Sequence, residues 1–389
     1  MSGILALMAD VVRALTLDQL RKRKSVKWRQ YPNDVLPLPV AEMDFESAPA
    51  IKTALIDMVE RSDTGYLGPF PELFDAFAKF ANSRWGWQVD TKQMRMATDV
   101  GVGIVEIMRV LIKPGEKVML NSPVYENIWR WITEVIATTV DTPLIEENLN
   151  YKLDLATIEK EYKAGVKLHI LCHPHNPVGF IFDKQQLAAL AELAKRYQVI
   201  ILSDEIHAPL SYDAKTFTPF LDVSDQAKEV GITITSASKS FNLAGLKCAF
   251  IITHSSELQE RINKMPLAVT WRASLFGAVA STAAYADSVA WLDGVLITLD
   301  NNRKLLSNLL QSKLPKVKYR IPDFGYLAWL DLSSLGLGDD PAAKILEKGK
   351  VALNGGVLYG PRHKNFVRFN FGTSPEIITE AVERIARSL

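Results

Sequence analysis

The sequence predicts an α/β protein built on a mostly parallel sheet. Between about residues 95 and 255, short apolar runs alternate with stretches of helical periodicity. The runs VIIL and GITIT lack polar alternation, as expected of strands that helices cover on both faces. Polar and ionisable residues follow these runs directly. This places them at the edge of the sheet where open parallel sheets bind ligands.

The predicted elements alternate along this part of the chain. The clearest helix runs from Asp183 to Tyr197, because Asp183 is suited to cap the first amides and an apolar stripe recurs at helical spacing. We expect this helix to pack on the sheet. In chain order, the expected strands are KVML, LHILC, VIILS, GITIT and CAFIIT.

The chain is expected to form two domains. Residues 46–284 would form the large domain, which contains the sheet. Residues 1–45 and 285–389 have a mixed α+β pattern, with helical stretches near 293–313 and 374–388. We expect these two terminal parts to form one smaller domain together.

Composition excludes several classes of partner. The 389 residues are 48% hydrophobic and carry a net charge of +1, so nothing in the total argues for nucleic acid or an anionic membrane. No run approaches the roughly 18 apolar residues that a membrane span requires, and the first residues show no basic leader. We expect a cytoplasmic protein with a small-molecule substrate. Cys172 and Cys248 lie in apolar runs and are expected to be buried, reduced thiols.

The residues that follow the apolar runs share a theme. They offer one aromatic ring, one amide, one carboxylate, two hydroxyls and one lysine, besides a histidine, and parallel strands would bring them into one crevice. In chain order they are Tyr125, Asn176, Asp204, His207, Ser236, Ser238 and Lys239.

This set of groups suits a phosphorylated pyridine aldehyde. A desolvated lysine has a lowered pKa and forms a Schiff base with an aldehyde. A carboxylate keeps the ring nitrogen protonated, so that the ring withdraws electrons, and an aromatic side chain stacks on the ring. Hydroxyls and the free amides of a helix start hold a phosphate. The sequence therefore predicts pyridoxal 5'-phosphate (PLP) as cofactor.

Six motifs then carry a resemblance over nearly the whole chain. The sequence resembles the fold-type I PLP enzymes, and more narrowly the MalY/PatB-type C–S lyases (cystathionine β-lyase-like) of the aminotransferase class I/II superfamily. Together, in order and with matching spacing, the motifs are specific. They are VAEMDF (40–45), DTGYLGP (63–69), HPHNPVG (173–179), SDEIHAPL (203–210), SASKSFNLAGLK (236–247) and VRFNFGTSPE (367–376).

The resemblance implies roles for particular residues. Lys239 would form the Schiff base, Asp204 would pair with the pyridinium nitrogen, and Asn176 would bond the ring O3′. Tyr125 would stack on the ring, and Arg368 would hold the substrate α-carboxylate with its planar fork. The phosphate would be bound by Ser236, Ser238, the amides of Val100 and Gly101, and Tyr66 of the neighbouring subunit. The resemblance also implies a seven-stranded sheet between helices and a homodimer with shared active sites.

Some residues depart from the pattern of relatives. Three residues after Asp204, aspartate-type aminotransferases have a tyrosine that touches O3′. Here the residue is His207, and the lyase-like group also has histidine at this position. Lys247 stands where many relatives have a phosphate-binding arginine, and it would still offer charge to the cofactor phosphate but without the two-pronged grip. Pro39 stands where the lyase group commonly has tryptophan, and Asp99 where relatives often have glycine.

Other readings of the sequence are weaker. Cys172, His173, His175 and His207 superficially suggest zinc, but their spacing is poor and no metal is expected. The segment DVGVGIVE has Glu106 where a dinucleotide fingerprint needs its third glycine. The basic run LRKRKSVKWR (20–29) is expected to be a structural or solvated face.

The expected activity is β-elimination from cystathionine or a related S-substituted cysteine, which gives a thiol, pyruvate and ammonia. Aminotransfer shares every step up to the carbanion, and the cofactor motifs do not separate the two reactions. An additional regulatory role through binding of another protein is a further alternative.

Overall fold

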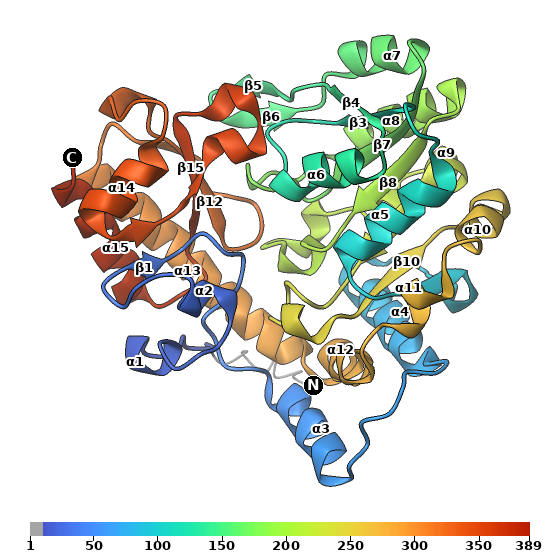
Figure 1. Cartoon of the computed structure of the whole chain (residues 1–389), viewed down its shortest axis with the longest axis horizontal. Coiled ribbons are helices and arrows are strands. Elements are labelled where there is room, and N and C mark those ends of the chain that lie inside the picture. The colour runs from blue at the N-terminus through green and yellow to red at the C-terminus, as the bar shows by residue number, and fades with distance from the viewer. Residues whose placement is uncertain (1–10) are drawn as a thin grey trace, which may run out of the picture.

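The computed structural model describes residues 11–389 of the chain. The first ten residues, for which we expected no leader, lie outside the described residues. Figure 1 shows two parts with a space between their ribbons. One is built on a large sheet and the other on a smaller sheet near the C-terminus.

A seven-stranded sheet forms the centre of the larger part. Four of its six strand pairings are parallel, and β10 runs antiparallel to both of its neighbours. The predicted seven-stranded, mostly parallel sheet is therefore confirmed. In sheet order the strands are β2 (Met94–Ala97), β10 (Ala249–Ile252), β9 (Gly231–Thr235), β8 (Ile200–Asp204), β7 (Val166–Cys172), β3 (Lys117–Leu120) and β4 (Thr138–Asp141).

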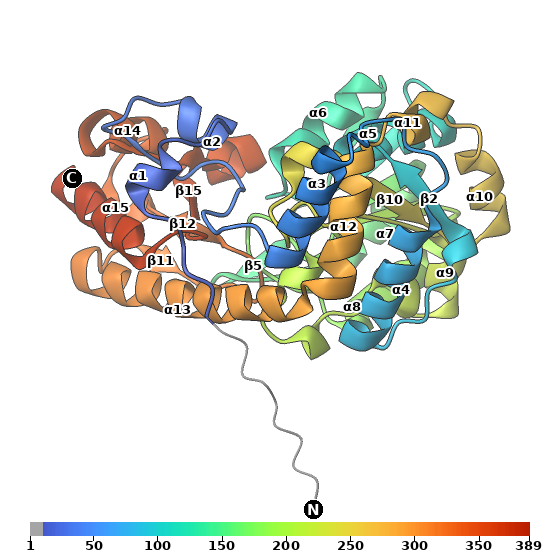
Figure 2. The ribbon, with the colours of Figure 1, turned by 90° about the horizontal axis from the view of Figure 1, so that it is seen from below.

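Helices cover both faces of this sheet because both faces are apolar (Figure 2). On β7, Ile170 joins the buried cluster that includes α5, α6 and α10, whereas Leu171 joins the cluster that includes α4, α8 and α12. The helices of this part are α3 (Pro49–Glu60), α4 (Pro71–Trp85), α5 (Val100–Leu111), α6 (Glu126–Glu134), α7 (Leu155–Lys163), α8 (Lys184–Tyr197), α9 (Asp225–Val230), α10 (Ser256–Ile262), α11 (Leu267–Trp271) and α12 (Leu275–Asp287).

The helix predicted after Asp183 forms as expected. The Asp183 carboxylate accepts a hydrogen bond from the backbone nitrogen of Gln186 at 2.7 Å and so caps α8. The side chains that face the sheet are buried at helical spacing, and they are Leu187, Leu190, Ala191 and Ala194.

A four-stranded sheet forms the smaller part, together with helices from both ends of the described chain. The N-terminal segment joins it because β1 (Leu36–Pro37) pairs in parallel with β13 (Val351–Ala352). A separate hairpin consists of β5 (Ile145–Glu147) and β6 (Asn150–Lys152). The remaining elements are α1 (Leu17–Leu20), α2 (Val26–Arg29), α13 (Val289–Lys313), α14 (Pro341–Gly349), α15 (Pro375–Arg387) and the strands β11 (Lys318–Tyr319), β12 (Leu327–Asp331), β15 (Phe366–Asn370) and β14 (Asn354–Gly355).

Part of the basic run at 20–29 folds inward. Lys27 is fully buried, and its Nζ lies 2.8 Å from the Asp44 carboxylate, which is also fully buried. The indole nitrogen of Trp28 donates to the other oxygen of Asp44 at 2.9 Å. A buried charge needs such a partner. The pair anchors the VAEMDF segment, in which the Ala41 carbonyl oxygen lies 3.1 Å from Lys239 Nζ.

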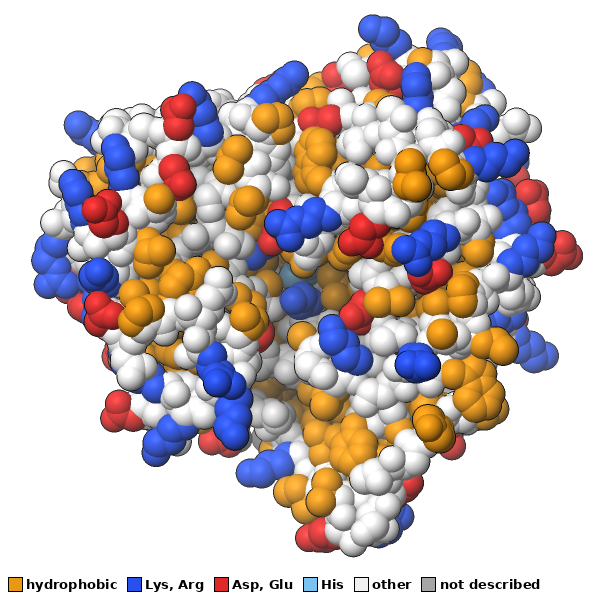
Figure 3. All heavy atoms as spheres, in the orientation of Figure 1, with side chains coloured by type: hydrophobic (Ala, Val, Ile, Leu, Met, Phe, Trp, Pro, Cys, Tyr) orange, Lys and Arg blue, Asp and Glu red, His pale blue; other side chains and the backbone are white. Residues whose placement is uncertain are grey.

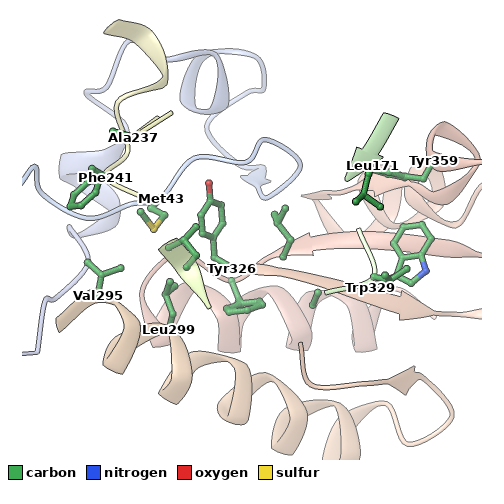
Figure 4. Packing of buried hydrophobic residues seen from close by; sticks show 14 of the residues in the cluster. Met43, Leu171, Ala237, Phe241, Val295, Leu299, Tyr326, Trp329 and Tyr359 are labelled. Carbon is green, nitrogen blue, oxygen red and sulfur yellow. The ribbon is translucent and has the colours of Figure 1, made fainter. Parts of the chain in front are cut away.

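The core joins segments that are far apart in the sequence. Figure 4 shows Met43 near Phe241 and Tyr326, above Val295 and Leu299 of α13. Both cysteines are buried and free, as predicted. In the part of the chain that the structure describes, no helix combines the length and apolar character that a membrane crossing needs.

Candidate active site

A cavity of about 600 Å³ opens at the carboxyl ends of the parallel strands. Figure 3 shows this face of the molecule hollowed near its centre, with basic side chains around the hollow. The structure brings together ten of the residues singled out from the sequence. They are Val100, Gly101, Tyr125, Asn176, Asp204, His207, Ser236, Ser238, Lys239 and Lys247.

Lys239 lies in the loop that follows β9. Its Nζ donates a hydrogen bond to the carbonyl oxygen of Ala41 at 3.1 Å. Burial lowers the pKa of the Lys239 amine to about 8, and the nearby positive charge of Arg368 acts in the same direction. A substantial fraction of this amine is therefore neutral near physiological pH, and a neutral amine is a nucleophile and a base.

Asp204 ends β8 and is only 5% exposed. Its Oδ1 accepts a hydrogen bond from the backbone nitrogen of Ile206 at 3.2 Å. Burial raises the pKa of the Asp204 carboxyl to about 6, while this hydrogen bond and the Lys239 charge oppose the rise. A cationic partner in the cavity would stabilise the carboxylate form.

His207 and Asn176 both line the cavity and are both buried. Burial lowers the pKa of His207 to about 3, and the charges of Lys239 and Arg368 add to this effect, so the imidazole is neutral. Its Nδ1 is buried and finds no hydrogen-bond partner within residues 11–389. Asn176 Oδ1 accepts a hydrogen bond from Arg368 at 3.2 Å.

Tyr125 precedes α6, and its ring lines the cavity. The hydroxyl oxygen accepts a hydrogen bond from Asn127 Nδ2 at 2.7 Å, and the ring lies edge-on to Trp131 with 5.7 Å between centroids. Burial, and to a lesser degree Glu126, raises the pKa of Tyr125 to about 12, so the phenol is neutral. These contacts fix an aromatic face beside the cavity.

The start of α5 also lines the cavity. Asp99 caps this helix through a 2.8 Å bond from the backbone nitrogen of Val102, and its other oxygen lies 2.9 Å from Lys247 Nζ. The Asp99 carboxylate thus pairs with Lys247. Gly101 has no room for a side chain, because a Cβ there would lie 2.8 Å from a ring carbon of Trp131.

The two predicted phosphate-binding serines are joined by a hydrogen bond. The Ser236 hydroxyl donates to the Cys248 carbonyl oxygen at 2.6 Å and accepts from the backbone nitrogen of Ser238 at 3.1 Å. Donation to an anion would therefore require the Ser236 hydroxyl to rotate away from Cys248.

Arg368 lies on β15 and is 2% exposed. Besides its bond to Asn176, it donates to the Pro39 carbonyl oxygen at 2.8 Å, and its guanidinium lies 5.1 Å from the ring centroid of Tyr359. Its Nε is buried with no hydrogen-bond partner among the described residues. A buried guanidinium with spare donors is suited to bind an anion.

Tyr66 is not brought into the cavity of its own chain. Its side chain lies in the loop between α3 and α4, and the residue is 93% exposed. The contact with a neighbouring subunit stays a prediction.

The histidines near the strand ends are held by the backbone. His173 Nε2 lies 3.1 Å from the Thr218 carbonyl oxygen, and His175 Nε2 lies 2.8 Å from that of Pro123. Between residues 11 and 389, no cluster of three histidine, cysteine or acidic side chains is suited to hold a metal ion.

Sequence reasoning missed contacts that pass through backbone atoms. The Ala41 carbonyl oxygen accepts bonds from Lys239 and from the hydroxyl of Tyr326. Asn242 fixes the same segment, because its side chain exchanges two 2.9 Å bonds with the backbone of Met43. A carbonyl oxygen carries no signal in the sequence. Asn242 did carry a signal, because it is a polar residue within the FNLAG run beside the lysine.

Lys239 and the buried Asp204 line a cavity at the carboxyl ends of parallel strands, and the buried Arg368 contacts Asn176, which also lines it. This arrangement is that of an α/β enzyme of the fold-type I class. The sequence matches the family Aminotransferase class I and II over residues 33–385, and the chain belongs to this family.

Named relatives cover almost the full length of the chain. A putative cystathionine β-lyase of Mycobacterium tuberculosis is 37% identical over 98% of this chain and 99% of its own length. The cystathionine β-lyase PatB of Bacillus subtilis is 31% identical over 94% and 97%. A crystal structure described as a putative PLP-dependent β-cystathionase from Corynebacterium diphtheriae superposes with a TM-score of 0.91 at 33% identity, over 97% of this chain and 98% of that one.

Proposed function

We propose that this chain is a PLP-dependent carbon–sulfur β-lyase. Its substrate is cystathionine or a related S-substituted cysteine, and its products are a thiol, pyruvate and ammonia. The observation that carries the proposal is the full-length similarity to proteins named cystathionine β-lyase. The cavity supports it, because it holds the groups that this chemistry needs.

The residues of the cavity fit PLP. The volume of about 600 Å³ lies within the range of about 300–1,000 Å³ that small-molecule sites occupy. His207 Nδ1 is buried and has no hydrogen-bond partner in the described part of the chain. Buried polar atoms are normally hydrogen-bonded, so a polar group of a bound ligand would satisfy it. Val100 and Gly101 at the start of α5 line the cavity, and the free amides of a helix start suit a phosphate.

Each part of the cofactor has candidate partners. Asp204 would hold the ring nitrogen, Asn176 and His207 the ring oxygen, and Tyr125 the ring face. The phosphate would lie against Ser236, Ser238, Lys247 and the amides of Val100 and Gly101, with Tyr66 of the neighbouring subunit.

When bound, PLP supplies an aldehyde for the substrate amine and an electron-withdrawing ring. Once the substrate amine has replaced Lys239 on the cofactor aldehyde, the freed Lys239 amine would act as the base that removes the substrate α-proton. Its buried surroundings favour the neutral form that can take up a proton. The C–H electron pair moves towards the β-carbon as the thiolate leaves. Lys239 holds the proton on Nζ, within reach of the Ala41 carbonyl oxygen.

Arg368 orients the substrate for this step. Its contacts with Asn176 and Pro39 fix the guanidinium plane, and a planar fork binds an α-carboxylate through two parallel hydrogen bonds. The α-carbon is thereby held at a constant position relative to Lys239. Orientation of this kind is worth orders of magnitude in rate.

The wider assembly forms part of the same proposal. The chain acts in the cytoplasm as a homodimer whose active sites are shared between subunits. Residues 46–284 form the cofactor-binding domain, and residues 1–45 with 285–389 form the smaller domain. Support for this division comes from the pairing of β1 with β13 and from the place of the four-stranded sheet.

Substrate turnover tests the proposed reaction. Purified protein with bound PLP is mixed with L-cystathionine, and pyruvate and free thiol are measured with no keto acid present. We expect both products in equal amounts. Turnover that requires a keto-acid acceptor would replace the lyase assignment with aminotransfer.

A further inference from the structure

The carbonyl oxygen of Ala41 accepts two hydrogen bonds. Lys239 Nζ donates to it across 3.1 Å, and the Tyr326 hydroxyl donates to it across 3.0 Å. The lysine lies after β9, the tyrosine directly before β12, and the acceptor in the segment between β1 and α3. Three segments far apart in the sequence therefore meet on one oxygen atom.

We propose that Tyr326 is a positioning residue that acts on Lys239 through the Ala41 carbonyl. This inference rests on the proposed function, since it concerns the step in which Lys239 takes up the substrate α-proton. The substrate C–H bond breaks, its electron pair stays with the substrate, and the proton forms the third N–H bond of the amine. The ammonium then has a fixed acceptor in the Ala41 carbonyl oxygen.

Tyr326 is itself rigidly held. It is 1% exposed, and Figure 4 shows its ring in the buried cluster beside Met43. Its ring also lies 6.4 Å from that of His207, measured between centroids. Burial raises the pKa of the Tyr326 hydroxyl well above its usual range, so the group remains a hydrogen-bond donor.

The carbonyl groups on either side of Ala41 have their own donors. Asn370 Nδ2 donates to the carbonyl oxygens of Val40 and Glu42 at 2.7 and 2.8 Å. Tyr326 gives Ala41 the corresponding bond. Without the Tyr326 bond, Lys239 would be the side-chain donor left to the Ala41 oxygen. Because Lys239 moves during the reaction, the direction of the Ala41 carbonyl would then depend on the lysine itself.

Other groups that set the charge of Lys239 do not touch this bond. Arg368 disfavours the ammonium form, whereas the carboxylates of Glu42, Asp204 and Glu126 favour it. A Tyr326→Phe substitution removes one hydroxyl and leaves all four charges in place. A change in the behaviour of Lys239 in that variant therefore reports on the Ala41 carbonyl.

The first test compares the kinetics of wild type and Tyr326→Phe with L-cystathionine. We expect kcat to fall about tenfold, because one hydrogen bond that orients the base is lost. KM should stay within about twofold, because Tyr326 does not contact the Arg368 guanidinium through any hydrogen bond of the structure.

The second test needs no turnover. The cofactor-free chain is acetylated at a series of pH values, and mass spectrometry gives the fraction of Lys239 that reacts. A hydrogen bond to the ammonium form raises an amine pKa, so loosening of the Ala41 carbonyl should lower the pKa of Lys239 by about half a pH unit in Tyr326→Phe.

Tyr212→Phe is the matched control. The Tyr212 hydroxyl donates to the carbonyl oxygen of Gly325 at 2.5 Å, so this variant loses the same kind of bond beside the same turn without touching Ala41. It should retain the kcat and the Lys239 pKa of wild type. Equal effects of both variants, no effect of Tyr326→Phe, or a higher Lys239 pKa in it would each overturn the proposal. A wild-type protein that does not cleave cystathionine would sink the proposed function, while the acetylation test would still decide the link to Lys239.

Discussion

At the scale of single residues, the chemistry depends on an amine whose charge is set by its surroundings. Burial and Arg368 lower the pKa of Lys239, while burial raises that of Asp204. The two shifts favour the neutral forms of both groups in the chain alone. A cofactor aldehyde would react with the neutral Lys239 amine, and a protonated ring nitrogen would stabilise the Asp204 carboxylate.

Attachment of PLP to the cofactor-free chain should depend on pH in a way that reports the Lys239 pKa. The neutral amine is the nucleophile, so the rate should rise through pH 6 and 7 and level off above about pH 8, where the amine has lost its proton. Borohydride quenching at set times, followed by mass spectrometry, measures this rate. A rate that still rises steeply near pH 10 would show an unperturbed lysine.

Lys239→Ala should abolish β-elimination, because both the covalent anchor and the base are lost. The loss of kcat should be at least about 10⁴-fold. Lys184→Ala, which removes an exposed lysine at the start of α8, is the control and should keep wild-type activity. Pyruvate release from cystathionine is the measurement, and appreciable release by Lys239→Ala would contradict the assignment.

Arg368→Lys should weaken substrate capture. A lysine cannot reproduce the planar fork or the contacts with Asn176 and Pro39, so kcat/KM should fall about 10- to 100-fold, mainly through KM. Arg196→Lys on the exposed face of α8 serves as control. Steady-state kinetics with cystathionine decide the point, and an unchanged KM would place the carboxylate elsewhere.

At the scale of elements, the sequence predicted the strands and the cap of α8 because those features depend on local pattern. Apolar runs marked β3, β7, β8, β9 and β10, and Asp183 marked the start of α8. The antiparallel direction of β10 was not predicted, because strand direction depends on how the chain returns to the sheet. The contacts of Ala41 escaped for a similar reason, since they join backbone atoms to side chains about 200 and 285 positions away.

The start of α12 supports the loop that follows Lys239. A Cβ on Gly277 would lie 2.3 Å from the Leu246 carbonyl oxygen and 2.9 Å from Cys248 Cβ. Gly277→Ala should therefore displace this loop, lower stability by about 1–3 kcal/mol and weaken PLP binding. Gly355→Ala, whose added Cβ would meet atoms at ordinary distances of 3.6 and 3.7 Å, is the control. Chemical denaturation and PLP titration measure both effects, and wild-type values for Gly277→Ala would refute the close packing.

At the scale of the whole molecule, the exposed position of Tyr66 makes a shared active site testable. Dimers are assembled from one Lys239→Ala subunit and one Tyr66→Phe subunit. If Tyr66 acts across the interface, one of the two sites in each hybrid has both native residues, so the hybrid should recover about half of wild-type activity. If Tyr66 acts within its own chain, neither site is intact and the hybrid should match the impaired parents.

The central claim is that one buried amine at the end of β9 holds an aldehyde cofactor covalently. Borohydride reduction of the native, cofactor-loaded protein, followed by peptide mass spectrometry, tests this most directly. The account predicts a pyridoxyl group on Lys239 at close to one per chain. Labelling of another lysine, or a protein that carries no such group, would contradict it.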